Sequence, residues 1–267
     1  MFELYIFMFI VVGLFAGFLG GLLGIGGGII IVPTLILLFQ LLEFPSDTIM
    51  QVAAGTSLAS IIILAGSSAY SHYKKNGINF EVLYYLTPGM VVGAIFGGIA
   101  AQLFPSHQLI YIFAFFISLV GCYFLFFSKK DSEESTICKL PSLYLFTLIG
   151  LTISSLSSFF GIGGGIITMP CLKSVGLSTR NAISTSAISG FIIAVVGALT
   201  FAFVGMFKMH TNGFFGYLYL PAFICIGISS AISARVGAHY AYIFPPLLLN
   251  RLFGVLILLI AMLLFFR

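Results

Sequence analysis

Two glycine-rich segments with the same sequence are the residues best suited to bind a small ligand. Gly24–Ile30 reads Gly-Ile-Gly-Gly-Gly-Ile-Ile and is followed by Pro33. The same seven residues recur at Gly161–Ile167, followed by Pro170. Glycine lets the backbone leave helical geometry, which frees N–H groups, and inside a membrane such groups are tolerated only where protein or a polar cavity surrounds them. A half-helix after each segment adds the positive end of its dipole, so the pair predicts a cradle for an anion.

Glycine also serves a plainer purpose, because small residues at four-residue spacing let membrane helices pack closely. We favour this packing interpretation for the glycines that precede Gly24. Packing does not require three glycines in a row, so the triplets are predicted to contact the substrate: Gly26, Gly27, Gly28 and Gly163, Gly164, Gly165. A nucleotide-binding loop is excluded, because Ile29 and Ile166 stand where that motif needs its last glycine.

A Thr-Ser pair follows each glycine segment at a matching position: Thr56 with Ser57, and Thr185 with Ser186. Their hydroxyls could donate to the oxygens of an anion, or they could bond back to carbonyls of their own helices. Both interpretations remain open, and we include the four residues in the predicted site.

Gln102 and Arg235 also occupy equivalent positions, late in their apolar segments. An arginine at such a place ordinarily extends its charge to the membrane interface. The pair is a weak candidate for a gate or pore mouth.

The remaining polar residues argue against other chemistry. All seven Asp and Glu and all four His lie in loops or at segment ends, so no buried carboxylate or imidazole suggests proton coupling. The four cysteines lack metal-site spacing, and no nucleophile–base arrangement is evident. We expect neither a metal nor a cofactor, and no enzyme activity.

The composition places these segments in a membrane. Hydrophobic residues make up 60% of the 267 residues and charged residues 7%, against about 25% charged in soluble domains. Apolar segments of about the 20 residues that cross a bilayer lie at 4–23, 49–71, 82–103, 107–127, 141–160, 181–207, 214–238 and 246–266. The sequence therefore predicts an all-α polytopic membrane protein with eight full transmembrane helices. Two short segments broken by Gly and Pro, 28–42 and 165–172, are predicted between them.

The matching motifs predict a duplicated chain. Residues 1–127 would form the first membrane repeat and residues 141–267 the second, with a polar linker at 128–140. The short glycine segment supplies a fifth pass in each half, and an odd number of passes is what inverted repeats require.

Loop charges support this inversion. Lysines at 74–75 and 129–130 predict cytoplasmic loops in the first half, whereas the acidic loop Glu43–Asp47 would lie outside. Lys173 and Arg180 occupy the second-half equivalent of that acidic loop, so the basic side switches between halves. The linker would then be cytoplasmic and both termini periplasmic. We attribute the net charge of +4 to this topology and not to nucleic-acid binding.

The chain resembles the TauE/SafE family of sulfite and organosulfonate exporters over about residues 5–265. The resemblance rests on the glycine-proline segment of each half, the Thr-Ser pair after it, and the helices that begin near Pro88 and Pro221. It implies movement of small sulfur oxyanions or sulfonates, such as sulfite, taurine-derived products or thiosulfate, across the bacterial inner membrane.

These observations together predict a secondary transporter for small sulfur-containing anions that works by alternating access. Export is favoured, because an interior-negative potential drives an anion outward by about 2.3 kcal/mol per charge per 100 mV. The alternatives are a non-transporting scaffold for assembly of a redox complex and an anion channel. The expected partners are the small anion and the lipid bilayer, without nucleic acid, and a homo-oligomer is left open.

Overall fold

The computed structural model describes residues 2–23, 26–74, 77–126, 143–208, 213–240 and 246–266. The predicted linker at 128–140 lies outside these ranges, as do Gly24 and Ile25 of the first glycine segment. The helices of the first half are α1 (Phe2–Leu23), α2 (Gly28–Leu41), α3 (Ile49–Lys74), α4 (Phe80–Ala100) with the short 3-10 helix η1 (Ala101–Leu103), and α5 (Ser106–Phe126). Those of the second half are α6 (Leu143–Phe160), α7 (Gly165–Ser174), α8 (Thr179–Met206), α9 (Leu220–Tyr240) and α10 (Pro246–Phe265). The strands β1 (Phe214–Phe215) and β2 (Leu218–Tyr219) form an antiparallel hairpin before α9.

The prediction of a polytopic α-helical membrane protein is confirmed. Among the described residues, seven helices are long and apolar enough to cross a membrane: α1, α3, α4, α5, α8, α9 and α10. The remaining predicted span, 141–160, is the 18-residue helix α6. Helices α2 and α7 have 14 and 10 residues, about 21 and 15 Å, so each is too short to cross about 30 Å of hydrocarbon.

One predicted boundary is corrected. The segment expected to cross the membrane from residue 214 begins as the hairpin, and α9 starts only at Leu220. Gly213 and Gly216 have φ values of +87° and +60°, which a helix cannot accommodate. Apolar composition alone did not reveal this turn, because Phe214 and Phe215 are as apolar as the transmembrane helix that they were predicted to start.

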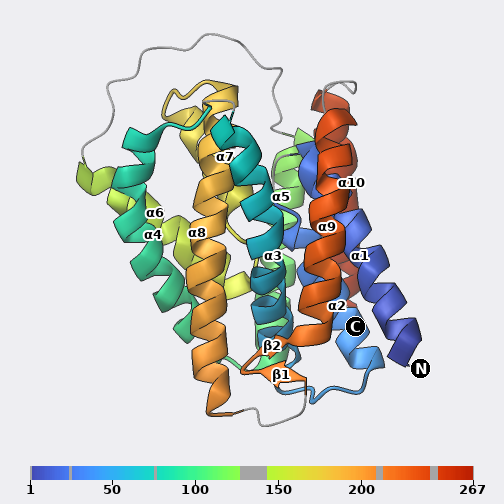
Figure 1. Cartoon of the computed structure of the whole chain (residues 1–267). Helices are drawn as coiled ribbons and strands as arrows, with labels where there is room; N and C mark the ends of the chain where they lie inside the picture. Colours follow the sequence, from blue (N-terminus) through green and yellow to red (C-terminus); the bar gives the residue numbers. More distant parts are fainter. Residues whose placement is uncertain are drawn as a thin grey trace.

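Helix α2 folds back along α1. The rings of Phe9, near the start of α1, and Phe39, near the end of α2, lie 6.4 Å apart. At the other end of α2, a Cβ on Gly27 would lie 3.0 Å from the carbonyl oxygen of Ala16. Helix α2 therefore begins at mid-height in the bundle and runs to one end, and Figure 1 places α7 toward the opposite end.

The two halves interlock through glycine-lined helix pairs. Helix α1 packs along α9, where Gly13 faces Ile226 and Gly21 faces Ala234, so these two helices run parallel. Helix α4 packs along α6 in the same way: Gly89 faces Thr147, Gly93 faces Leu151 and Gly97 faces Ser155. A Cβ at any of these glycines would meet the backbone of the partner helix. The packing interpretation of the glycines before Gly24 thus holds for Gly13 and Gly21.

Matched helices of the two halves also pack on one another, and they run antiparallel. In the pair α3 and α8, Leu58 lies against Gly197 and Phe191 lies against Gly66. In the pair α5 and α10, the rings of Phe124 and Phe253 lie 5.5 Å apart, and those of Tyr111 and Phe265 lie 6.5 Å apart. Helices α3 and α8 form the centre of the bundle in Figure 1.

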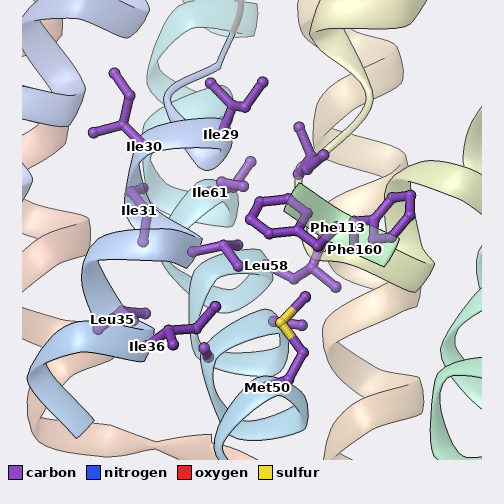
Figure 2. Close-up of a cluster of buried hydrophobic side chains, with 14 of the residues drawn as sticks. Ile29, Ile30, Ile31, Leu35, Ile36, Met50, Leu58, Ile61, Phe113 and Phe160 are labelled. Carbon is purple, nitrogen blue, oxygen red and sulfur yellow. The ribbon is translucent and has the colours of Figure 1, made fainter. Parts of the chain in front are cut away.

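The buried core surrounds the start of α2. Ile29, Ile31 and Leu35 of α2 pack beside Leu58 and Ile61 of α3, as Figure 2 shows, and each is at most 1% exposed. The outer faces of the long helices carry large apolar side chains, such as Phe96 and Phe203, which suits contact with lipid.

Candidate functional site

The glycine triplets form two tight turns, each of which starts a short helix. Gly26 and Gly27 have φ values of +79° and +56°, and the equivalent Gly163 and Gly164 have +76° and +77°. Residues with a side chain rarely adopt such values, which explains the first two glycines of each triplet. The third glycine of each triplet begins α2 or α7, as the dipole argument expects.

The two turns touch one another. A Cβ on Gly28 would lie 2.5 Å from the carbonyl oxygen of Ile162, which is closer than real atoms approach. The third glycine of the first triplet is therefore required by a contact between halves and not by its backbone conformation. The structure brings the two predicted triplets together inside the bundle.

Ile61 of α3 stands between the two turns. Its methyl groups lie 2.7 Å from the Cβ position of Gly28 and 2.9 Å from that of Gly163. One turn earlier on the same helix, the Ser57 hydroxyl donates to the carbonyl oxygen of Gly161 at 2.8 Å. Both residues tie the central helix of the first half to the turn of the second half.

Several N–H groups of the second turn remain available. The N–H groups of Ile167 and Thr168 both donate to the carbonyl oxygen of Gly164, at 3.1 and 3.0 Å. Over the described residues, no backbone carbonyl accepts a hydrogen bond from the N–H of Gly163, Gly164 or Ile166. The positive end of the α7 dipole therefore coincides with free donors.

The two threonines hold neighbouring segments of the backbone. Thr56 Oγ1 accepts a hydrogen bond from the N–H of Tyr219 at 3.0 Å, and Thr185 Oγ1 accepts one from the N–H of Asn79 at 3.0 Å. The Ser186 hydroxyl bonds back to the carbonyl oxygen of Ile183 at 2.9 Å. The sequence left open whether these hydroxyls donate to an anion or bond back to their own helices, and Ser186 makes the bond within its own helix. Both threonines accept from backbone outside their helices, a role that the sequence did not suggest.

Tyr219 lies at the end of the bundle that carries the hairpin, beside four other aromatic rings. The ring centroid of Tyr219 lies within 6.1 Å of the ring centroids of four phenylalanines: Phe9, Phe39, Phe44 and Phe214. Burial raises the pKa of the Tyr219 phenol above its ordinary value.

Gln102 and Arg235 lie at opposite ends of the bundle. Gln102 belongs to η1 beyond the end of α4, where Gly98 contacts Thr200 near the end of α8. Its Nε2 donates to the carbonyl oxygen of Gly98 at 3.2 Å. Arg235 is exposed near the end of α9, next to the end of α1. Neither residue contacts the glycine turns.

The sequence pattern did not single out two buried serines of α6. Ser157 and Ser158 are fully buried, and their hydroxyls have no hydrogen-bond partner among the described residues. Four serines between positions 154 and 158, directly before Gly161, were the available signal. In the described part of the chain, no three or more His, Cys, Asp or Glu side chains lie together so that they could hold a metal ion.

Comparison of the sequence with known proteins identifies a family that matches most of the chain. The model of the sulfite exporter TauE/SafE family matches residues 9–264. A "probable membrane transporter protein" of Haemophilus influenzae is 31% identical over 265 residues, covering 98% of this chain and 99% of the relative. A protein with the same description from Methanocaldococcus jannaschii is 27% identical, covering 93% of this chain and 92% of the relative. One from Bacillus subtilis is 28% identical, covering 79% and 82%. No solved structure matches the chain significantly.

Proposed function

The chain belongs to the sulfite exporter TauE/SafE family, and from this premise we propose that it is a secondary transporter of small sulfur-containing anions and not an enzyme. Sulfite, thiosulfate and organosulfonates form the proposed substrate class. The observation that carries the proposal is the contact between the two glycine turns inside the bundle, where Gly28 meets Ile162. Two helix starts that converge at mid-membrane are the arrangement in which transporters hold an anion.

The chemistry of the turns favours an anion over a cation. The groups available at the second turn are N–H donors, and the predicted site holds no carboxylate. A metal ion or Na⁺ needs oxygen acceptors, whereas a weakly hydrated oxyanion needs donors. The turns are therefore proposed to contact the oxygens of the anion.

We further propose that the two halves are inverted repeats that move by alternating access. The antiparallel packing of α3 on α8 and of α5 on α10 supports inversion, because these helices occupy the same place in each repeat. The opposite positions of α2 and α7 support it as well (Figure 1). The Ile61 side chain contacts both turns, and we propose that it stays between Gly28 and Gly163 when the two turns move apart to open the site.

The proposed location is the bacterial inner membrane, with both termini periplasmic, the 128–140 linker cytoplasmic, and export as the direction. Both chain ends lie at the same end of the bundle in Figure 1, which agrees with this placement. Lys74 is the last residue of α3 and Arg180 lies in the first turn of α8, both at the other end of the bundle, where positive charge favours the cytoplasm. The membrane potential then drives an anion outward without a coupling ion.

Flux through proteoliposomes of the purified chain tests the proposal. Sulfite, thiosulfate, taurine, sulfoacetate, sulfate and chloride would be offered under an imposed potential. Saturable movement of a sulfur anion is expected, whereas currents that do not saturate would indicate a channel. A folded chain that moves none of these anions would leave the scaffold function as the better account.

A further inference from the structure

Ser157, like its neighbour Ser158, differs from the hydrogen-bonded buried serines in the helices that flank the glycine turns. The hydroxyls of Ser60 and Ser189 each donate to the carbonyl four residues earlier, both at 2.9 Å, and Ser154 donates to Leu151 at 3.3 Å. Such bonds are the usual state of a hydroxyl in a membrane helix. Ser157 is 0% exposed and its hydroxyl makes no such bond with any described residue. Because a buried polar atom without a partner is costly, this one calls for an explanation.

The Ser157 hydroxyl lies against the second glycine turn. Its Oγ is 3.4 Å from the Cβ position of Gly164, the residue that precedes α7. Its carbonyl oxygen accepts a hydrogen bond from the N–H of Ile162 at 2.9 Å, which fixes the end of α6 to the turn. The hydroxyl therefore lies beside Gly164, in the turn where the N–H groups of Gly163, Gly164 and Ile166 have no backbone acceptor among the described residues.

The first half has no counterpart to this hydroxyl. Ser157 precedes Gly161 by four residues, and Gly20 occupies the same place before Gly24. A Cβ on Gly20 would lie 2.8 Å from the backbone nitrogen of Gly27, so the first turn leaves no room for a side chain. The two turns share a backbone conformation, and the difference between them is the serine hydroxyl beside the second turn.

We infer that Ser157 is a substrate-binding residue, whose hydroxyl donates to an oxygen of an oxyanion held at the second glycine turn. This inference rests on the proposed transport function and adds to it an asymmetry between the two turns. A hydroxyl and several N–H groups on one turn are directional donors, which suit an anion with several oxygens better than a spherical halide. The second turn is then the half of the site that selects oxyanions.

Ser158 provides a matched control on the neighbouring position. It is equally buried and its hydroxyl is equally unpartnered among the described residues. That hydroxyl lies 2.9 Å from the Cβ position of Gly197 and 3.4 Å from that of Gly98, at the crossing of α4, α6 and α8. Ser157→Ala and Ser158→Ala thus remove the same group from the same helix, and only Ser157→Ala removes it from the turn.

The test is the concentration dependence of sulfite and chloride flux in proteoliposomes of the full chain. Ser157→Ala is expected to raise the KM for sulfite about tenfold, to keep the maximal rate within about twofold, and to lower the preference for sulfite over chloride. Ser158→Ala is expected to behave as wild type. If Ser157→Ala does not fold, Ser157→Cys keeps the size of the side chain, replaces the hydroxyl with a weaker donor, and should shift the KM in the same direction.

The outcomes separate this inference from the proposed function. A wild-type KM and selectivity in Ser157→Ala would overturn the inference, and so would equal changes in both alanine variants. If the wild-type chain moves neither sulfite nor any other anion of the panel, the proposed function fails first, and this inference fails with it. As a second readout, the same concentration of sulfite should raise the thermal stability of wild type and of Ser158→Ala in detergent more than that of Ser157→Ala.

Discussion

Thr56 and Thr185 make the same hydrogen bond from opposite halves of the chain. Each Oγ1 accepts a backbone N–H at 3.0 Å, from Tyr219 in one case and from Asn79 in the other. Both N–H groups lie just before a helix, α9 or α4, that is the fourth helix of its half. Each threonine lies on the central helix of the other half, so α3 and α8 each position the residue that precedes a helix of the opposite half.

Thr185→Val is expected to destabilise the fold by about 1–3 kcal/mol, because the N–H of Asn79 would lose its acceptor in a partly buried position. Thr185→Ser keeps the oxygen and should retain most of the stability. The readout is thermal unfolding of the purified chain in detergent. The corresponding Thr56→Val and Thr56→Ser variants should rank in the same order, since the geometry is the same. Equal stabilities of the valine and serine variants at either position would show that these bonds contribute little.

Gly28→Ala is expected to reduce anion flux at least tenfold. The new methyl group would meet the Ile162 carbonyl oxygen at 2.5 Å and push the two glycine turns apart. Gly28 is the first residue of α2 and does not have a positive φ, so the substitution forces no left-handed backbone on alanine. Flux in proteoliposomes, with folding checked by size-exclusion chromatography, measures the effect.

Gly66→Ala is the control for that substitution. It adds the same methyl group to α3 in the same bundle, but its nearest neighbour is Cε2 of Phe191 at 3.3 Å, the edge of a side chain that can shift slightly. Flux should stay near the wild-type level. If Gly66→Ala loses as much flux as Gly28→Ala, the effect reflects general packing and not the contact between turns.

Gly89→Leu is expected to prevent stable folding. A side chain at Gly89 would meet the carbonyl of Thr147 on α6, where the two backbones are in direct contact. Overpacking a tight interface costs about 1–3 kcal/mol even for small insertions, and a whole leucine side chain exceeds that. The yield of monodisperse protein after purification measures the outcome, with Gly26→Ala as the comparison. A methyl group at Gly26 meets nothing within 4 Å, and only the positive φ opposes it. Monodisperse Gly89→Leu protein in normal yield would contradict the tight packing of α4 on α6.

The sequence predicted most of the fold, because membrane helices are defined by length and hydropathy. The repeated glycine motif also located both turns, since positive φ values leave few alternatives to glycine at Gly26 and Gly163. The roles of Thr56 and Ser57 were not predictable, because their partners Tyr219 and Gly161 lie 163 and 104 residues away in the chain. Such contacts depend on how the two halves interlock, which no local pattern encodes. The hairpin before α9 was missed for another reason: Phe214 and Phe215 are as apolar as the helix that follows them.

The orientation of the two halves gives a prediction that does not depend on the substrate. Asp47 follows α2 and Ser174 ends α7, each near the end of the short helix of its half, and both are exposed. In inverted repeats these two positions lie on opposite sides of the membrane. Single cysteines would be introduced as Asp47→Cys and Ser174→Cys, each in a chain whose four native cysteines are replaced by serine. A membrane-impermeant thiol reagent added to intact spheroplasts should label the Asp47→Cys chain, and should label the Ser174→Cys chain only after lysis. Labelling of both positions from outside would contradict inversion, and the reverse pattern would keep inversion but place both termini in the cytoplasm.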